Sequence, residues 1–327
     1  MAQTAKRQLR SDSIPSKRRC RSKSESETVH DEISAFIKYA RRKQTTYGRL
    51  HESLLELQQM IGMNEAKRAV LKQLRFLVVN RGDSDGHFLN TVLTGNPGCG
   101  KTTLARILFN IWKCTNSLGS RGHEQTFTIC RRSDLVAKYL GQTADKCRKF
   151  LSKVNGVLFI DEAYSLCYSD TDEYGHIALD CINEWLSHNQ DTVCIIAGYH
   201  ENLEKHFFSQ NPGLRRRFQW RFRINNYNAE DLAKIFLTQI NTKGWRLRVD
   251  FDDVKLLFGE AKRHFKDNGG STNKLCFACK MQYSERLFPR RGNKIITKKD
   301  LFNAIAIFKE GSEKENGNEM ASTYMYT

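Results

Sequence analysis

The chain has 327 residues, of which 39% are hydrophobic, and carries a formal net charge of +17. No apolar run approaches the length of about 18 residues that a membrane helix needs, and no signal-peptide block stands at the N-terminus. We therefore expect a soluble intracellular protein, cytoplasmic or nuclear, with no membrane partner. Its basic balance favours nucleic acid or acidic partners, and an indifferent basic surface is the alternative.

Residues 1–47 are predicted to form a basic, largely disordered tail. Residues 1–30 are rich in Ser, Lys and Arg and poor in apolar residues, so they lack the material for a packed core. Residues 31–44 fit a short amphipathic helix. Residues 15–23, PSKRRCRSK, resemble a nuclear localisation signal or a nucleic-acid-binding tail, which makes nucleic acid a candidate partner.

Residues 48–225 alternate between helix and strand patterns. Apolar residues recur at helical spacing from about Leu50, with a break at Gly62, and again over 102–114. The alternation predicts an α/β fold, with a parallel sheet covered by helices on both faces. The strand candidates are residues 88–95, 126–130, 156–161, 192–198 and 218–224.

Residues 226–311 show no further strand pattern and are predicted to form a small all-helical lid domain, followed by a flexible tail over 312–327. Cys276 and Cys279 form the one CxxC among ten cysteines. Without a second pair or a nearby His, this spacing favours a reduced structural pair on one helix face over a metal or redox site. The four expected helices span 228–244, 250–268, 271–288 and 297–311, with N-cap candidates Asn228, Asp250, Ser271 and Thr297.

The run GNPGCGKT, from Gly95 to Thr102, satisfies the P-loop pattern and lies between a predicted strand and a predicted helix. Its glycines let backbone N–H groups converge on phosphate, and the following helix adds its positive end. We expect Lys101 to reach the β- and γ-phosphates and Thr102 to offer its hydroxyl to Mg²⁺. The nucleotide-binding residues predicted here are Asn96, Pro97, Gly98, Cys99, Gly100, Lys101, Thr102 and Thr103.

The run GVLFIDEA, starting at Gly156, reads as a buried strand that ends in two acids. Ligands of open parallel sheets bind at the carboxyl ends of the strands, so these acids should face the nucleotide. We expect Asp161 to hold the Mg²⁺ shell together with Thr102, and Glu162 to orient or deprotonate the attacking water. A solvated helix cap is the alternative for Glu162. The pair predicts hydrolysis of ATP, with Mg²⁺ as the cofactor.

Together, GNPGCGKTT and VLFIDEAYSL resemble AAA+ ATPases. The runs DLVAKYLGQTADK at 134–146 and IIAGYHENLEKHFFSQNPGLRRRF at 195–218 are similar to the CbxX/CfqX family, which includes red-type Rubisco activases and stage V sporulation protein K. The resemblance spans roughly residues 50–310. It implies an AAA+ P-loop core with a helical lid, ATP hydrolysis, and a homo-oligomeric ring, expected to be a hexamer.

The resemblance also implies roles for residues around the nucleotide. Ile61 and Gly62 would line the adenine pocket, and Tyr199 takes the sensor-1 place after the strand at 192–198. Arg217 takes the arginine-finger place and would reach the γ-phosphate held by a neighbouring subunit. The adjacent arginines at 215 and 216 are weaker candidates for that role, with a basic patch as their alternative.

Two further positions concern the client and the lid. Tyr139 and Leu140 fall where AAA+ unfoldases place the aromatic pore loop that grips a peptide, and a buried tyrosine at a helix end is the alternative. Gly270 stands where the lid helix of the family usually carries the sensor-2 arginine. Lys274 is the candidate to substitute, although it lacks the bidentate guanidinium fork.

Three functions stay open at this point. The favoured one is an ATP-driven ring that remodels or threads protein clients. The second is a nucleic-acid-associated AAA+ ATPase, such as a loader or a helicase-like motor, which the basic charge favours. The third is a slow switch without turnover that recruits partners in its ATP state. The sequence does not indicate the client.

Overall fold

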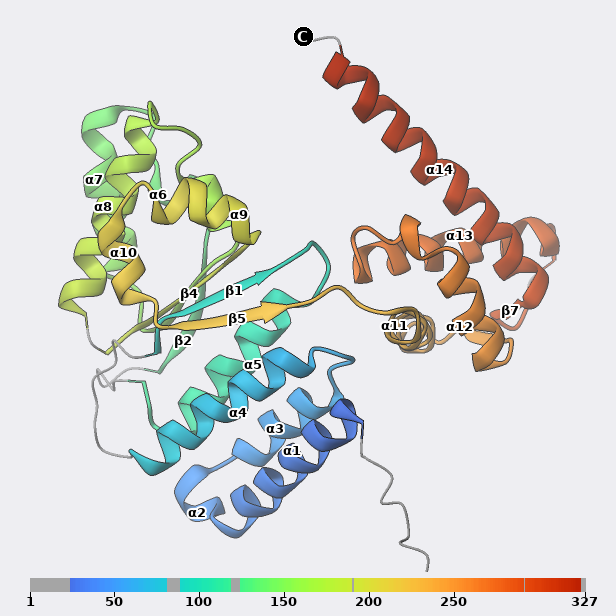
Figure 1. Ribbon diagram of the computed structural model, residues 1–327, viewed down its shortest axis with the longest axis horizontal. Coiled ribbons are helices and arrows are strands. Elements are labelled where there is room, and N and C mark those ends of the chain that lie inside the picture. Colours follow the sequence, from blue (N-terminus) through green and yellow to red (C-terminus); the bar gives the residue numbers. More distant parts are fainter. Residues whose placement is uncertain (1–23, 81–88, 119–123, 190, 291, 325–327) are drawn as a thin grey trace, which may run out of the picture.

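The computed structural model describes residues 24–80, 89–118, 124–189, 191–290 and 292–324, so the basic run at 15–23 lies outside the described part. Its centre is a five-stranded parallel sheet (Figure 1). The strands are β1 (Thr91–Gly95), β2 (Thr126–Cys130), β3 (Gly156–Ile160), β4 (Val193–Gly198) and β5 (Trp220–Ile224). Their order is β2-β3-β4-β1-β5. All five predicted strands are present, and their parallel pairing confirms the predicted α/β class.

Helices cover both faces of the sheet, because successive side chains of each strand point to opposite sides and both sets are apolar. Leu93, Phe159 and Phe222 pack into one core cluster, which also contains buried residues of α4 and α5, and Val92 and Leu158 pack into a second one, which contains buried residues of α8. The lower face in Figure 1 carries α4 (Asn64–Val79) and α5 (Lys101–Cys114). The upper face carries α6 (Arg132–Leu135), α7 (Leu140–Leu151), α8 (Glu173–His188), α9 (His200–Leu203), α10 (Pro212–Arg217) and helical turns at Ala163–Leu166 and Glu204–Phe208.

The N-terminal segment corrects the prediction of a largely disordered tail up to residue 47. Helix α1 (Glu25–Arg42) begins with a capping box, in which the backbone N–H groups of Ser24 and Glu27 each bond the side chain of the other residue. Its buried stripe includes Val29, Ile33 and Ile37, which recur at helical spacing. The stripe packs against α3 (Leu50–Gln59) and α4, and α2 (Gln44–Tyr47) connects α1 to α3.

The C-terminal region is helical, as predicted, and lies beside the sheet domain at the ends of β1 and β5 (Figure 1). It adds one unpredicted feature, a parallel pair formed by β6 (Arg246–Arg248) and β7 (Ile295–Thr297). The last helix also continues well past residue 311, so the predicted flexible tail over 312–327 is helical up to Tyr324. The helices are α11 (Ala229–Thr242), α12 (Phe251–Glu260), α13 (Gly269–Leu287) and α14 (Lys298–Tyr324), with a 3₁₀ turn at Lys262–His264.

One of the four predicted N-caps of the lid helices is wrong. Asn228 caps α11 through its side chain, which accepts from the N–H of Asp231. Ser271 is wrong as a cap, because α13 begins two residues earlier, after Asn268. Cys276 and Cys279 are buried free thiols on α13. Within the part of the chain that the structure describes, no helix combines the length and apolarity needed to cross a bilayer.

Candidate nucleotide-binding site

The loop between β1 and α5 turns through two glycines in the left-handed region, with φ of +64° at Gly98 and +89° at Gly100. Glycine adopts this conformation readily, whereas a side chain is strained there. A Cβ on Gly98 would also overlap the carbonyl oxygen of Asp267 and lie 2.7 Å from the amide nitrogen of Gly270. The predicted P-loop is therefore a tight turn that the lid domain touches from outside.

Lys101, the first residue of α5, folds back over this loop. Its Nζ donates to the carbonyl oxygens of Gly95, at 2.9 Å, and Asn96, at 2.8 Å. The same ammonium lies 5.8 Å from the centre of the Tyr199 ring, within range of a cation–π contact. A half-buried cation thus stands at the head of the loop, beside the end of β4.

The two predicted acids follow β3, whose five residues are all buried. Thr102 Oγ1 donates to Asp161 Oδ2 at 3.2 Å, which joins the start of α5 to the end of β3. Glu162 adopts a left-handed φ of +49° and its side chain is exposed. A positive φ is uncommon for a residue other than glycine and concentrates at functional sites. Glu162 is thus exposed on a strained backbone, while the hydrogen bond from Thr102 holds Asp161 at the start of α5.

These residues line one cavity of about 350 Å³ at the carboxyl ends of the strands. Burial, followed by the negative charge of Glu162, raises the pKa of Tyr164 to about 12. The ring of Tyr164 lies 5.7 Å from that of Tyr199, so two neutral tyrosines form the wall opposite the loop. The lining residues are Pro97, Gly98, Gly100, Lys101, Thr102, Thr103, Asp161, Glu162, Tyr164, Gly198 and Tyr199.

The donor set of this cavity fits magnesium. A threonine hydroxyl and an aspartate carboxylate are hard oxygen donors, which Mg²⁺ prefers, and the ion usually takes its other ligands from phosphates and water. Thr102 and Asp161 already lie within hydrogen-bond distance of each other. The residues present can therefore hold a Mg²⁺ ion beside a phosphate chain on the loop.

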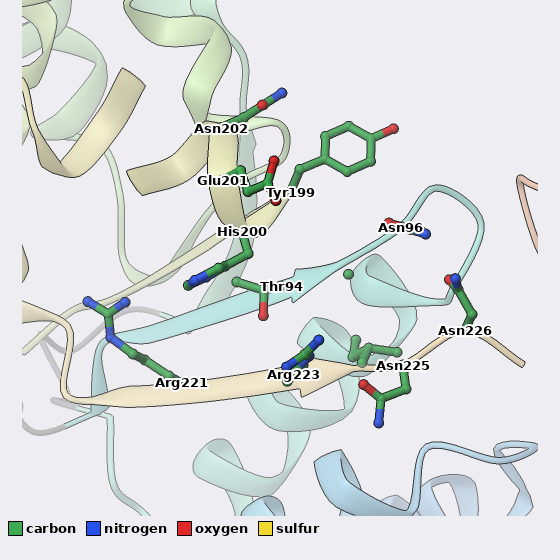
Figure 2. Close-up of a pocket in the computed structure, with 12 residues that line it drawn as sticks. Thr94, Asn96, Tyr199, His200, Glu201, Asn202, Arg221, Arg223, Asn225 and Asn226 are labelled. Atoms are coloured by element: carbon green, nitrogen blue, oxygen red, sulfur yellow. The ribbon is translucent and has the colours of Figure 1, made fainter. Parts of the chain in front are cut away.

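Two of the predicted loop residues lie outside this cavity. Cys99 is buried beneath the loop, where burial raises the pKa of its thiol. Asn96 lines a neighbouring cavity of about 730 Å³, which Figure 2 shows between β1, β5 and the start of α9. Tyr199 is common to both cavities. The loop thus separates an acidic cavity from a larger one that contains Arg221 and Arg223.

Ile61 and Gly62 line a third cavity, of about 220 Å³, between α1, α4 and α11. Neither residue lines the cavity around Lys101. The link between the two cavities is Tyr227, whose ring would lie 3.1 Å from a Cβ on Gly62 and whose Oη donates to Cys99 O at 2.9 Å. Tyr227 therefore connects the predicted adenine-pocket residues to the phosphate loop.

The three consecutive arginines of α10 have different environments. Arg217 donates to the carbonyl of Gly213 at 2.8 Å and to the hydroxyl of Ser187, whereas Arg215 forms an ion pair with Glu204. Arg216 is exposed, and its side chain has no hydrogen-bond or ion-pair partner among the described residues. Arg217 is the one held in place at the end of its helix without being neutralised by a carboxylate.

Tyr139 precedes α7 and its side chain is 69% exposed, so the alternative of a buried tyrosine at a helix end is wrong. Leu140 opens the same helix, and its side chain lies outside the described part of the structure. A largely exposed aromatic ring at a helix start provides apolar surface for contact with another molecule.

Comparison with known proteins identifies the group to which this site belongs. The model of the ATPase family associated with various cellular activities (AAA) matches residues 91–226, from β1 to just past β5. The cfxQ-like protein R730 of Acanthamoeba polyphaga mimivirus is 31% identical over 283 residues, which cover 84% of this chain and 69% of the relative. The chain belongs to the CfxQ-like family of AAA ATPases. This confirms the resemblance predicted from the motifs.

Other relatives agree with this assignment. The chloroplastic ribulose bisphosphate carboxylase/oxygenase activase of Cyanidioschyzon merolae is 30% identical to this CfxQ-like chain, over 74% of the chain and 85% of the relative. The solved FIGL-1 AAA domain in complex with ADP superposes with a TM-score of 0.55 at 20% identity, over 76% of this chain and 83% of that one. At this identity the second likeness concerns the fold alone.

As a CfxQ-like AAA ATPase, the protein binds nucleotide and hydrolyses ATP, and the alternative of a switch without turnover is wrong. Two residues at its site escaped the sequence analysis. Tyr227 and Asn268 lie beyond the end of β5, and both bond carbonyl groups of the phosphate loop. Asn268 was placed at the end of the helix expected over 250–268, and no sequence pattern indicated that either residue would contact residues 97–99.

Proposed function

We propose that this CfxQ-like ATPase hydrolyses Mg·ATP in the cavity between the β1–α5 loop and the end of β3. In this proposal Lys101 exchanges its two carbonyl partners for the β- and γ-phosphates, and Thr102 and Asp161 hold a Mg²⁺ ion that offsets phosphate charge. The observation that carries the proposal is the hydrogen bond between Thr102 and Asp161 with Glu162 opening into the same cavity.

Glu162 is proposed as the residue that orients and deprotonates the attacking water. Asp161 is bonded to Thr102, whereas Glu162 is exposed, so one acid is available for the metal and the other for water. Burial keeps the neighbouring Tyr164 and Tyr199 neutral by raising their pKa, and with Asp161 assigned to the metal, the carboxylate of Glu162 is the proton acceptor of the cavity in this proposal. Tyr199, in the sensor-1 place, would hold the γ-phosphate from the side of β4.

We propose that Arg217 acts on the nucleotide of a neighbouring copy in a ring, with a hexamer as the expected size. No arginine is among the described residues that line the cavity of the chain's own site. An arginine that stabilises charge in phosphoryl transfer can be supplied in trans by a second copy, which agrees with this lining. A guanidinium has five N–H groups. Arg217 donates two of them, to Gly213 and Ser187, so three remain for a phosphate.

The client proposed for this machine is a polypeptide that Tyr139 and Leu140 contact. The exposure of Tyr139 supports a gripping role, because an aromatic ring buries apolar area on a peptide without reading its sequence. The name of the Cyanidioschyzon merolae relative, an activase of another enzyme, also agrees with a protein client. Nucleic acid is the alternative partner, supported by the net charge of +17.

The experiment is the variant Glu162→Gln, in the full-length chain, with Lys101→Ala as control. Glu162→Gln should keep ATP bound while turnover falls by at least about 100-fold, the size of a lost general base. Lys101→Ala should lose ATP binding itself. Retained turnover in Glu162→Gln would refute the base. Stimulation of the wild-type ATPase by single-stranded DNA or RNA, and not by unfolded polypeptide, would replace the proposed client.

A further inference from the structure

The start of helix α13 lies against the phosphate loop. Asn268, which precedes α13, is 1% exposed and holds a left-handed φ of +47°. Its Nδ2 donates to the carbonyl of Pro97 at 3.1 Å, and its Oδ1 accepts from the N–H of Tyr227 at 3.2 Å. One buried side chain therefore connects the lid, the chain segment that enters the lid, and the loop.

The adjoining backbone makes a second contact with the loop. The N–H of Gly269 donates to the carbonyl of Gly98 at 3.1 Å. Because a Cβ on Gly98 would overlap the carbonyl of Asp267, the two backbones touch directly at this point. Any change in the shape of the loop at Gly98 must therefore move the start of α13, or break this contact.

The contacts form a continuous set along the loop. The carbonyls of three successive residues, Pro97, Gly98 and Cys99, accept hydrogen bonds from Asn268, Gly269 and Tyr227 in that order. A loop that binds phosphate turns its N–H groups toward the anion, so its carbonyl groups need partners elsewhere. The lid and the segment before it supply these three partners.

Neither residue considered for the sensor-2 role makes such a contact. Gly270 has no side chain. The Nζ of Lys274 lies 3.7 Å from Oδ2 of Asp267, and more than half of the Lys274 side chain is exposed. Lys274 does not line the cavity around Lys101. Asn268, in contrast, is buried between the two domains and bonds the loop.

We propose that Asn268 is the positioning residue that couples the lid to the nucleotide, through the backbone of the phosphate loop rather than through a phosphate contact. The inference rests on the assignment of this loop as the ATP site. When nucleotide stabilises the loop conformation that the lid contacts, it also stabilises the docked lid. By linkage, docking of the lid raises the affinity for nucleotide by the same factor.

The test compares Asn268→Gly and Asn268→Asp with wild type in the full-length chain. Both substitutions suit the positive φ, and both remove the amide donor to Pro97, while Asp keeps an acceptor for the N–H of Tyr227. Asn226→Ala is the control, because it removes only the other acceptor of the Asn268 amide. The probes are ADP affinity, ATPase KM and kcat, and amide hydrogen exchange in α13 with and without ADP.

We expect both Asn268 variants to bind ADP about tenfold more weakly, which is about 1.4 kcal/mol, with KM rising more than kcat falls. ADP should slow exchange at the start of α13 in wild type and in Asn226→Ala, and much less in the Asn268 variants. Unchanged ADP affinity in the variants, or equal ADP-dependent protection, would overturn the coupling. Wild-type protein that does not bind ADP would overturn the nucleotide site itself and this inference with it.

Discussion

Replacing Gly98 by Ala tests whether the lid and the phosphate loop share one backbone contact. The new Cβ would overlap the carbonyl of Asp267 and stand 2.7 Å from the amide of Gly270. These neighbours are backbone atoms, which cannot turn aside as the end of a side chain can. The lid must therefore move away from the loop, or the loop must change shape.

The magnitude follows from two contributions. The left-handed φ of +64° costs about 1–2 kcal/mol for a residue with a Cβ. Displacing the lid breaks the bonds from Asn268 to Pro97 and from Gly269 to Gly98, each worth about 1 kcal/mol. We expect Gly98→Ala to lower the free energy of unfolding by about 3–4 kcal/mol, a large part of the usual 5–15 kcal/mol.

Gly244 provides a matched control in the same chain. It has a similar φ of +72°, and a Cβ there would meet no atom within 4 Å. Gly244→Ala should therefore lose only the backbone contribution of about 1–2 kcal/mol. The assay is urea denaturation of both variants. Equal losses for the two would refute the argument, because they would mean that the docked lid places no steric demand on the loop.

Three further predictions concern the arginine finger, the client and pH. Arg217→Ala should lower kcat about 1,000-fold, and mixing it with Lys101→Ala protein should restore part of the activity if the finger acts between copies. No restoration would place Arg217 within its own site. Tyr139→Ala should abolish stimulation of the ATPase by unfolded polypeptide, whereas Tyr139→Phe should keep it; equal stimulation in both would exclude a gripping ring. A bond from Arg132 lowers the pKa of Asp172 from 3.8 to about 2, so the stabilisation by ionised Asp172 is present above pH 3.8 and is lost toward pH 2. Asp172→Asn should cost about 2 kcal/mol at pH 7 and make the melting temperature less sensitive to pH between 4 and 2; an unchanged pH profile would contradict this.

The sheet could be predicted from the sequence because its strands are buried on both faces. Runs such as GVLFI at 156–160 are apolar throughout, and turn or helix signals bound them. The pair β6 and β7 was missed because each strand has three residues, too few to show a period. The start of helix α1 was predicted six residues too late, although it carries a readable signal, Ser24 with Glu27 three positions later. The basic composition up to residue 30 outweighed that signal.

At the nucleotide site, too, some residues could be predicted from the sequence and others could not. Lys101, Thr102, Asp161 and Glu162 follow from motifs, because the chemistry of phosphate and metal demands those side chains at the ends of a strand and a helix. The contact between α13 and the loop does not follow from a motif. Two of its three hydrogen bonds come from a backbone N–H and an asparagine amide, groups that occur throughout any chain. Such a contact is specified by the position of the whole lid.

Different carbonyl groups of the phosphate loop bond the residue that would bind phosphate and the residues that hold the lid. The carbonyls of Gly95 and Asn96 accept from the Lys101 ammonium, which is the side chain that a phosphate would recruit. The next three carbonyls accept from the lid and its entry segment. In the proposed mechanism a phosphate would recruit the Lys101 ammonium away from the β1 end of the loop, while the α5 end would keep its partners. The residue that would bind phosphate and the residues that hold the lid thus bond different carbonyls of one loop.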